Sequence, residues 1–377
     1  MKRHFCYVTG TRADFGLMEG TLRRIHAHQQ LALSVCVTGM HLSPLHGNTV
    51  TEVEHSGLRI CGRIPVSHEK ADGATMAAAL AHVLLGLIPL LQQEKPDAVI
   101  LLGDRGEMLA GAIAAIHLNI PVVHVHGGER SGTVDEPVRH AISKLAHYHF
   151  TATVAARERL IRMGEGPAHV FVTGAPGLDG ITDAPRRSRA ELCAGLGLDS
   201  ARPVALLLYH PVLQTADAAG REMAEVLAAV QAAGVQVVCL TPNADAGNRA
   251  IREEIARVAQ LPGFRVATHF SRPDYLSWLA AADVMVGNSS SGIIEAASFG
   301  LPVVNVGNRQ QGRERNVNTT DVLAEWAAIH TALTAALSRG RQARQNVYGD
   351  GQAAERIIEL LSTLPFPQDL LNKSNAY

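Results

Sequence analysis

Short apolar segments rich in β-branched residues alternate with longer Ala- and Leu-rich segments along most of the chain. The short segments are predominantly apolar, which is typical of strands in parallel sheets whose two faces are both covered by helices. We predict strands at residues 4–8, 33–37, 98–102, 122–125, 149–152 and 169–172 in the first half, and at residues 204–208, 235–240, 265–267, 284–286 and 303–306 in the second. The pattern indicates an α/β fold of two doubly wound, Rossmann-like halves rather than one large sheet.

A segment rich in Gly, Pro and Asp at residues 173–185 separates the two halves. This composition is typical of an interdomain linker. We therefore expect an N-terminal domain over residues 1–175 and a C-terminal domain over residues 176–365. The remaining residues, 366–377, are expected to form a poorly ordered tail.

The 377 residues include 34 Lys and Arg against 35 Asp and Glu, so the formal net charge is −1. This balance argues against a general nucleic-acid binder, which normally carries a basic excess. The longest apolar stretch, residues 77–91, is interrupted by His82, Gly86 and Pro89 and falls short of the roughly 20 residues that span a bilayer. The five cysteines are scattered and form no C-x-x-C pair, which suits a reducing compartment. We expect a cytoplasmic protein without a nucleic-acid or membrane partner.

Glycines and polar side chains follow nearly every predicted strand. In doubly wound sheets, ligands bind beyond the carboxyl ends of the strands. Because both halves carry Arg, Asp or His at these strand ends, we expect two binding edges that face each other. The ligand would then lie in a cleft between the domains.

The first strand leads through Thr-Gly-Thr-Arg at residues 9–12 into a predicted helix. Backbone N–H groups at such a helix start suit a phosphate, and Arg12 could bind it with two hydrogen bonds. The alternative is an ordinary strand-to-helix turn with a surface arginine. The segment is neither G-x-G-x-x-G nor a Walker loop, so the sequence indicates no nicotinamide or ATP cofactor.

A second candidate begins at residue 287 as Gly-Asn-Ser-Ser-Ser-Gly. Ser289 and Ser290 would offer hydroxyl and N–H groups to an anion at a helix start. Glu295 lies about one and a half turns further on, where a carboxylate suits the hydroxyls of a ribose. The alternative is that one serine is only the N-cap of the helix, but three consecutive serines favour a binding site.

A third group combines acids and histidines that follow the strands at residues 98–102 and 122–125. Its members are Asp104, His124, His126, Glu129, Asp135, Glu136, Arg139 and His140. Carboxylates and histidines that lie close together shift each other's pKa values, as acid–base chemistry requires. The alternative is a polar network that only holds the glycine loop at residues 127–128. The sequence has no H-x-x-x-H or C-x-x-C spacing, so we expect no metal site.

Taken in order, these segments resemble the hydrolysing UDP-N-acetylglucosamine 2-epimerases of sialic-acid-type sugar biosynthesis. The resemblance rests on residues 9–16, 38–41, 103–105, 127–129, 139–144, 210–211, 242–247, 287–290 and 309–313. Thr-Arg-Ala-Asp at residues 11–14 looks like the hydrolysing branch, whereas relatives that keep the sugar on UDP carry Thr-Arg-Pro-Glu there. The resemblance implies the two-domain GT-B fold, no metal or redox cofactor, and a homodimer or a dimer of dimers.

The resemblance also implies that UDP lies mainly on the C-terminal domain, with the sugar toward the N-terminal domain. It assigns the phosphates to Ser289 and Ser290 and the ribose to Glu295. It assigns further nucleotide- or substrate-side contacts to Arg12, His41, His210, Asn243 and Arg313. The catalytic candidates are Asp104, His126, Glu129, Asp135 and Arg139.

The chemistry of this family explains those residue types. The C2 proton is removed while the C1–O bond to the diphosphate breaks, and the resulting 2-acetamidoglycal then takes up water. Arg12 and the two serines would stabilise the growing charge on UDP. Asp104 and Asp135 are the candidates for the carboxylates that the sugar carbons require.

One position departs from the family pattern. Many members have His-x-Glu-Gly-Gly-Glu where this chain has His-Val-His-Gly-Gly-Glu at residues 124–129. Either His126 takes over the proton transfer, for which a histidine is suited near neutral pH, or Glu129 supplies the carboxylate.

The expected substrate is UDP-N-acetylglucosamine, converted to N-acetylmannosamine and UDP. The alternative is a UDP- or GDP-linked 2,4-diacetamido-2,4,6-trideoxyhexose of the legionaminic acid route, because the histidine form is frequent among enzymes assigned to it. Other classes that fit the same fold are a GT-B glycosyltransferase and a non-catalytic nucleotide-sugar sensor.

Overall fold

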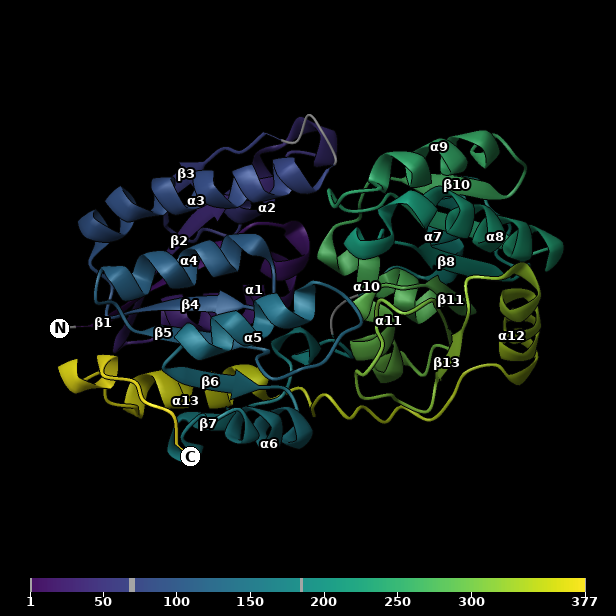
Figure 1. The fold of residues 1–377 in the computed structure, drawn as a ribbon. Coiled ribbons are helices and arrows are strands. Elements are labelled where there is room, and N and C mark those ends of the chain that lie inside the picture. The colour runs from purple at the N-terminus through teal and green to yellow at the C-terminus, as the bar shows by residue number, and fades with distance from the viewer. Residues whose placement is uncertain (1, 68–71, 184–185, 377) are drawn as a thin grey trace.

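Two parallel sheets with helices packed around them form the two halves of the molecule (Figure 1). The computed structural model describes residues 2–67, 72–183 and 186–376. The N-terminal sheet has the strand order β3-β2-β1-β4-β5-β6-β7, and the C-terminal sheet the order β10-β9-β8-β11-β12-β13. In both sheets the order reverses beside the first strand in the sequence, as in doubly wound folds. The two halves expected from the hydrophobic pattern are therefore present.

The N-terminal strands are β1 (Arg3–Thr9), β2 (Leu31–Thr38), β3 (Ile60–Ile64), β4 (Ala98–Leu102), β5 (Val122–Val125), β6 (Tyr148–Thr151) and β7 (Val170–Val172). The C-terminal strands are β8 (Val204–Leu208), β9 (Gln236–Leu240), β10 (Phe264–Ala267), β11 (Val284–Gly287), β12 (Val303–Val306) and β13 (Thr319–Val322). The α-helices are α1 (Arg12–Ala27), α2 (Val50–His55), α3 (Gly73–Glu94), α4 (Gly106–His117), α5 (Asp135–Leu145), α6 (Val154–Arg162), α7 (Arg189–Leu196), α8 (Ala219–Ala232), α9 (Asn248–Val258), α10 (Arg272–Ala281), α11 (Ser290–Ile294), α12 (Trp326–Arg339) and α13 (Ala353–Thr363).

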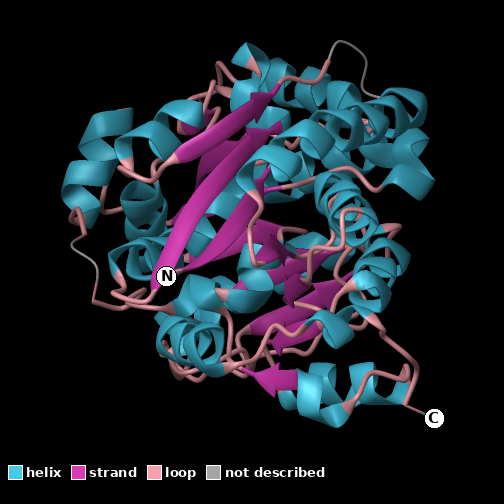
Figure 2. Ribbon diagram, turned by 90° about the vertical axis from the view of Figure 1, so that its left-hand side faces the viewer, coloured by secondary structure: helices cyan, strands magenta, loops and turns pink. Residues whose placement is uncertain are grey.

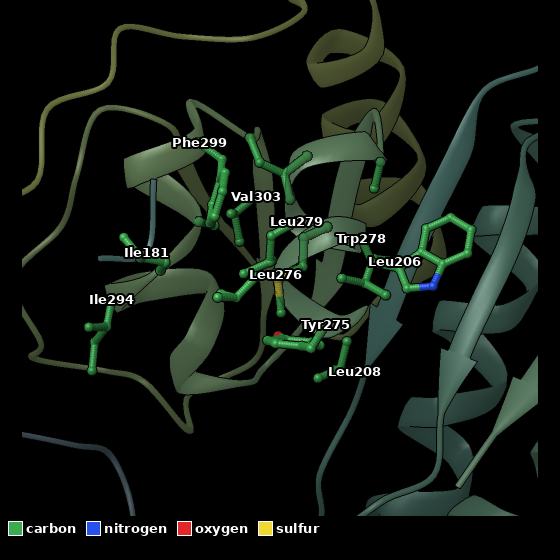
Figure 3. Packing of buried hydrophobic residues seen from close by; sticks show 14 of the residues in the cluster. Ile181, Leu206, Leu208, Tyr275, Leu276, Trp278, Leu279, Ile294, Phe299 and Val303 are labelled. Atoms are coloured by element: carbon green, nitrogen blue, oxygen red, sulfur yellow. The ribbon is translucent and has the colours of Figure 1, made fainter. Parts of the chain in front are cut away.

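Each sheet is covered by helices on both faces, and each face has its own apolar core (Figure 2). In the N-terminal domain, Phe15 of α1 packs on one face and Leu87 of α3 on the other. In the C-terminal domain, α10 places Trp278 and Leu279 among Leu206 and the other residues drawn in Figure 3. The continuous apolar strands are buried because both of their faces meet such a core.

The C-terminal helix α13 belongs to the N-terminal domain, which corrects the expected boundary at residue 365. Ile357 and Leu361 of α13 lie in the same core as Phe15 of α1. Figure 1 shows α13, in yellow, on the N-terminal half of the molecule. The sequence expectation failed here because an amphipathic helix does not encode which of two sheets it covers.

The segment after α13 is also docked, in contrast to the poorly ordered tail that we expected. The Phe366 ring meets the ring of Phe5 edge-on, with centroids 5.7 Å apart. Lys373 donates hydrogen bonds to the carbonyl groups of residues 143, 144 and 146 at the end of α5, at 2.6–3.0 Å. Its ammonium also pairs with the buried carboxylate of Glu165 at 2.6 Å. The ring of Phe366 and the ammonium of Lys373 thus hold the tail against the N-terminal domain.

The chain crosses between the domains twice, and the two crossings lie side by side. The first follows β7, and the second precedes α13. The N–H of Ala175 in the first crossing donates to the carbonyl of Tyr348 in the second, at 2.8 Å. A Cβ on Gly174 would lie 3.5 Å from the Cα of Gly349, so the two backbones approach closely there. Ala184 and Pro185, at the end of the predicted linker, lie outside the described residues.

Helix α3 is apolar on its solvent side as well as on its buried side. Val83, Leu87 and Leu91 are buried, whereas Leu85 is 68% exposed. The exposed positions follow helical spacing and include residues 74, 77, 78, 81, 82, 85 and 89. By length and composition alone α3 could cross a membrane, although the sequence interruptions suggested otherwise. Its buried face nevertheless packs in the N-terminal core as a crossover helix between β3 and β4.

Candidate functional site

The carboxyl ends of the two sheets face a cavity of about 270 Å³ that both domains line. Ten of the residues singled out from the sequence lie on its wall, namely Arg12, Asp104, His126, Glu129, Arg139, His210, Asn243, Ser289, Ser290 and Arg313. In the N-terminal domain they lie at the start of α1, after β4, after β5 and on α5, and in the C-terminal domain after β8, after β9, at the start of α11 and after β12. The expectation of a ligand cleft between two facing edges thus agrees with the placement of these side chains.

The start of α1 fixes the first of these residues. Thr11 is the N-cap and accepts a hydrogen bond from the N–H of Asp14, while the Asp14 carboxylate accepts one from the N–H of Thr11 at 2.8 Å. This capping box ends the turn after β1 and makes Arg12 the first residue of the helix. The Arg12 guanidinium reaches across the cleft and donates to the carbonyl of Phe270 in the C-terminal domain. A cation is therefore held between the domains.

Two serines lie opposite Arg12 at the start of α11. Ser289 is the N-cap, and its hydroxyl accepts a hydrogen bond from the N–H of Ser291 at 3.3 Å. Ser290 follows as the first helical residue, and both serines line the cavity. The serines and Arg12 also line an adjoining cavity of about 160 Å³. Glu295 lies in this second cavity, where Arg272 forms an ion pair with its carboxylate.

His210 is held as a neutral hydrogen-bond donor. Burial is the main cause that lowers the pKa of His210 to about 3, and the nearby Arg309 lowers it further. The Nδ1 atom accepts a hydrogen bond from the N–H of Asn243 at 3.3 Å, so the proton of the neutral ring is on Nε2. The backbone N–H of His210 is fixed by the side chain of Asn288 at 2.7 Å. The ring can donate one hydrogen bond to an oxygen in the cavity.

The buried Arg139 and the partly exposed Asp104 form a charge pair on the wall of the cavity. The side chain of Arg139 is 1% exposed and forms an ion pair with Asp104. Its guanidinium also donates to the carbonyl of Glu129 at 3.0 Å and to the hydroxyl of Ser131 at 3.3 Å. Asp104 follows Gly103, whose carbonyl accepts a hydrogen bond from His124 at 2.7 Å. Burial lowers the pKa of His124 to about 3, so this ring is a neutral support of the loop rather than an acid–base group.

His126 and Glu129 form a second pair beside Arg139. Nδ1 of His126 lies 2.5 Å from Oε1 of Glu129, and Arg313 from the C-terminal domain forms an ion pair with the other carboxylate oxygen. Further ion pairs across the cleft join Arg105 to Asp245 at 3.6 Å and Asp135 to Arg309 at 3.9 Å. The domains are thus held together by several charged contacts around the cavity.

Three of the expected site residues do not line this wall: Glu295 lines the adjoining cavity, and His41 and Asp135 line neither cavity. His41 is fully buried behind it, where its ring nitrogens lie 3.0 Å and 2.9 Å from the hydroxyls of Thr9 and Thr49. Burial lowers the pKa of His41 to about 4, so it is a neutral support rather than a direct ligand contact. Asp135 lies in the first turn of α5 and faces Arg309.

Sequence reasoning missed several residues of the wall. Arg309 lies in a segment that the sequence singles out, but only its neighbour Arg313 was assigned a contact. Asp14 is buried, and this burial raises its pKa to about 6. The signal for Asp14 was available, because a residue three positions after an N-cap threonine completes a capping box. No group of three His, Cys, Asp or Glu side chains that could hold a metal ion occurs in the part of the chain that the structure describes.

Comparison with known proteins identifies the family of this chain. The family model described as UDP-N-acetylglucosamine 2-epimerase matches residues 23–362. A Legionella pneumophila protein, UDP-N,N'-diacetylbacillosamine 2-epimerase (hydrolyzing), is 52% identical over 377 residues, which is 100% of both chains. A Neisseria meningitidis UDP-N-acetylglucosamine 2-epimerase is 33% identical over 96% of this chain and 95% of its own.

Solved structures match the arrangement of the two domains. The crystal structure of UDP-GlcNAc 2-epimerase from Neisseria meningitidis bound to UDP-GlcNAc has a TM-score of 0.78 at 18% identity, and the match covers 95% of this chain and 99% of that one. This likeness confirms the GT-B-like fold of two Rossmann-like domains that the resemblance implied. The chain therefore belongs to the UDP-N-acetylglucosamine 2-epimerase family and is an enzyme of the 2-epimerase class.

Proposed function

We propose that this enzyme is a hydrolysing 2-epimerase that converts UDP-N,N'-diacetylbacillosamine and water to 2,4-diacetamido-2,4,6-trideoxymannose and UDP. The observation that carries the proposal is the 52% identity to the Legionella pneumophila enzyme over the full length of both chains. The proteins named for UDP-N-acetylglucosamine are more distant, at 33% identity or below. Of the two substrates expected from the sequence, this is the alternative one.

The cavity offers the groups that the first half of this reaction needs. Arg12, the two serines and the donor N–H of His210 surround the place where a diphosphate would accumulate charge as the C1–O bond breaks. Asp104, paired with Arg139, supplies a carboxylate for the positive charge that develops at C1. Loss of the C2 proton then gives a 2-acetamidoglycal. Addition of water at C1, with protonation of C2 from the opposite face, completes the change of configuration.

The substrate assignment predicts a preference that kinetics can measure. We expect kcat/KM for UDP-N,N'-diacetylbacillosamine to exceed that for UDP-N-acetylglucosamine by at least about tenfold, because a pocket that holds the 4-acetamido and 6-methyl groups loses their contacts with the second sugar. UDP release from each compound, measured separately, gives the ratio. A ratio of one or less would restore UDP-N-acetylglucosamine as the substrate.

The product distinguishes the proposed reaction from the other classes. In D2O, a hydrolysing 2-epimerase forms a free reducing sugar with deuterium at C2, which proton NMR detects directly. A glycosyltransferase would need an acceptor and would form a glycoside instead. A nucleotide-sugar sensor would bind UDP and leave the sugar nucleotide intact.

We also infer a homodimer that covers the exposed apolar face of α3. Ala77, Ala78 and Ala81 allow a second helix to approach closely, and Leu85 adds apolar area beside them. From residue 73 to residue 93 the helix has no Asp, Glu, Lys or Arg, so it lacks the basic side chains that bind an anionic membrane surface. The same face on a second copy, related by a two-fold axis, is complementary to it.

The variant Leu85→Glu is expected to convert the dimer to a monomer, since each interface would then contain two buried like charges. Light scattering after gel filtration measures the mass directly. Leu261→Glu is the matched control, because Leu261 is 42% exposed in the C-terminal domain, far along the sequence from α3. A wild-type monomer, or a dimer that survives Leu85→Glu, would contradict this assembly.

We further propose that the enzyme works in the cytoplasm. The five cysteines are all free thiols in the structure, and four of them are buried in the cores. Proteins whose cysteines are free thiols are typical of a reducing compartment such as the cytoplasm.

A further inference from the structure

The loop that follows β5 holds His126 in an unusual backbone conformation. Its φ angle is +64°, in the left-handed region that few residues other than glycine adopt. The two glycines after it are tightly enclosed, since a Cβ on Gly127 would lie 2.9 Å from Nδ1 of His124 and one on Gly128 would lie 2.4 Å from the carbonyl oxygen of Ala156. Strain of this kind persists only where the surroundings impose it. The packing therefore fixes the position of His126 on the cavity wall.

The two ring nitrogens of His126 have different surroundings. Nδ1 lies 2.5 Å from Oε1 of Glu129 and donates its proton to that carboxylate. Nε2 has no hydrogen-bond partner among residues 2–67, 72–183 and 186–376, and the ring borders the cavity. In the neutral ring Nε2 then carries a lone pair, which can accept a proton from a bound sugar.

Glu129 has both carboxylate oxygens engaged. One accepts from His126 and the other pairs with Arg313, and the side chain is only 4% exposed. Burial raises the pKa of Glu129, but the charges of Arg313 and His126 outweigh this effect and hold the pKa below its ordinary value. Glu129 is therefore a carboxylate at neutral pH with no free oxygen directed to a substrate.

We propose that Nε2 of His126 takes the C2 proton and that Glu129, held by Arg313 from the opposite domain, is its positioning residue. This inference rests on the proposed function and decides between the two residues that the sequence left open. The electron pair of the C2–H bond forms the C1=C2 double bond, and the C1–O pair leaves with UDP. His126 becomes an imidazolium whose charge Glu129 balances, as the buried aspartate does in a Ser-His-Asp triad.

Because Arg313 lies on the opposite domain, the proposed catalytic set depends on how the two domains are placed. Arg313 follows β12 in the C-terminal domain, whereas His126 and Glu129 follow β5 in the N-terminal domain. The complete His126–Glu129–Arg313 set therefore needs residues of both domains. Proton abstraction would therefore depend on the same placement of the domains that brings Arg12 to the carbonyl of Phe270.

The first test compares His126→Asn with Glu129→Gln in the full-length enzyme. Asparagine tolerates a positive φ, so His126→Asn keeps the loop while removing the proton acceptor. We expect kcat to fall by about 100-fold or more in His126→Asn, with KM within about threefold of wild type. Glu129→Gln should retain more activity, because the amide oxygen still accepts from Nδ1.

A pH profile separates positioning from a merely structural role. In Glu129→Gln the protonated His126 ring loses the carboxylate that stabilises its charge. The fall of kcat on the acidic side of the pH profile should therefore begin at a lower pH than in the wild-type enzyme. The variant His126→Glu carries the residue that is common in the family, and it should be more active than His126→Asn. Its kcat should also fall at a lower pH than that of the wild-type enzyme, because a carboxyl has a lower ordinary pKa than a histidine. The charged and titratable groups around the His126–Glu129 pair that remain constant in this comparison are Asp104, His124, Arg139, Arg313 and Tyr348.

The controls keep the two proposals distinct. UDP affinity and circular dichroism report whether each variant is folded. Wild-type enzyme that leaves UDP-N,N'-diacetylbacillosamine and UDP-N-acetylglucosamine intact would overturn the proposed function, and with it the inference. Wild-type enzyme that turns over would overturn the inference alone if His126→Asn keeps more than about a tenth of kcat, or if Glu129→Gln is the more damaging variant.

Discussion

Replacing Asp104 by alanine is expected to reduce the free energy of unfolding by about 3–5 kcal/mol and kcat by at least about 1000-fold. The stability loss follows from Arg139, whose side chain is 1% exposed and would remain buried without its carboxylate partner. The activity loss follows from the proposed role of Asp104 beside C1. Urea unfolding and the initial rate of UDP release measure the two effects separately.

The double variant Asp104→Ala/Arg139→Met tests the cause. Methionine removes the uncompensated charge and fills much of the same volume, so we expect the double variant to recover most of the stability lost in Asp104→Ala. Activity should not recover, because the carboxylate is still absent. A double variant no more stable than Asp104→Ala would show that the buried charge is not the cause.

Deleting residues 366–377 is expected to lower the free energy of unfolding by about 3–5 kcal/mol. The deletion removes the ring of Phe366 from Phe5 and Tyr148, whose centroids lie 5.7 Å and 5.4 Å away. It also removes Lys373 from the last carbonyl groups of α5 and from Glu165. The same helix carries Arg139, so the activity of the truncated enzyme should fall as well. Thermal and urea unfolding measure the stability, and Lys373→Met is the matched control, with an expected loss of about 1–2 kcal/mol.

The charge of Glu165 gives this prediction a pH dependence. Burial raises the pKa of Glu165, but His149, Lys144 and Lys373 outweigh it and lower the pKa from 4.5 to about 2. A depressed carboxyl pKa stabilises the fold fully above the unfolded value and loses this contribution as the pH falls toward the folded value. We expect wild-type stability to decline between about pH 4.5 and about pH 2, and the decline to be shallower in Lys373→Met. If the free energy of unfolding declines with pH equally steeply in the wild type and in Lys373→Met, Lys373 is not a cause of the lowered pKa of Glu165.

The sequence predicted the central strands closely because their signal is local. β4, β5, β8 and β12 begin and end at the predicted residues, and each is an apolar run with at most one polar residue, His124 in β5 and Asn305 in β12. The edge strands β3 and β13 were missed, because an edge strand is only partly covered and its sequence, such as Thr319–Val322, has no such run. The placement of α13 was also missed, since it depends on packing between segments that are far apart in the chain.

Prediction of the site was good where a motif marks a strand end and poor where a contact spans the cleft. Arg12, Asp104 and Ser290 were found because each follows a buried strand in a recognisable turn. The ion pair between Arg313 and Glu129 joins residues 184 positions apart, and no local pattern encodes it. His41 stands at the expected turn, but sequence alone does not distinguish a residue on the wall from one directly behind it.

The paired backbones at Gly174 and Gly349 restrict the path by which the two halves can separate. A single connecting segment would leave each half free to rotate about it in several directions. Two segments joined by the hydrogen bond from Ala175 to Tyr348 would act together as one hinge, and would confine any opening of the cleft to a rotation about that line. Residues on opposite sides of the cleft would then meet in the same register whenever the two halves come together.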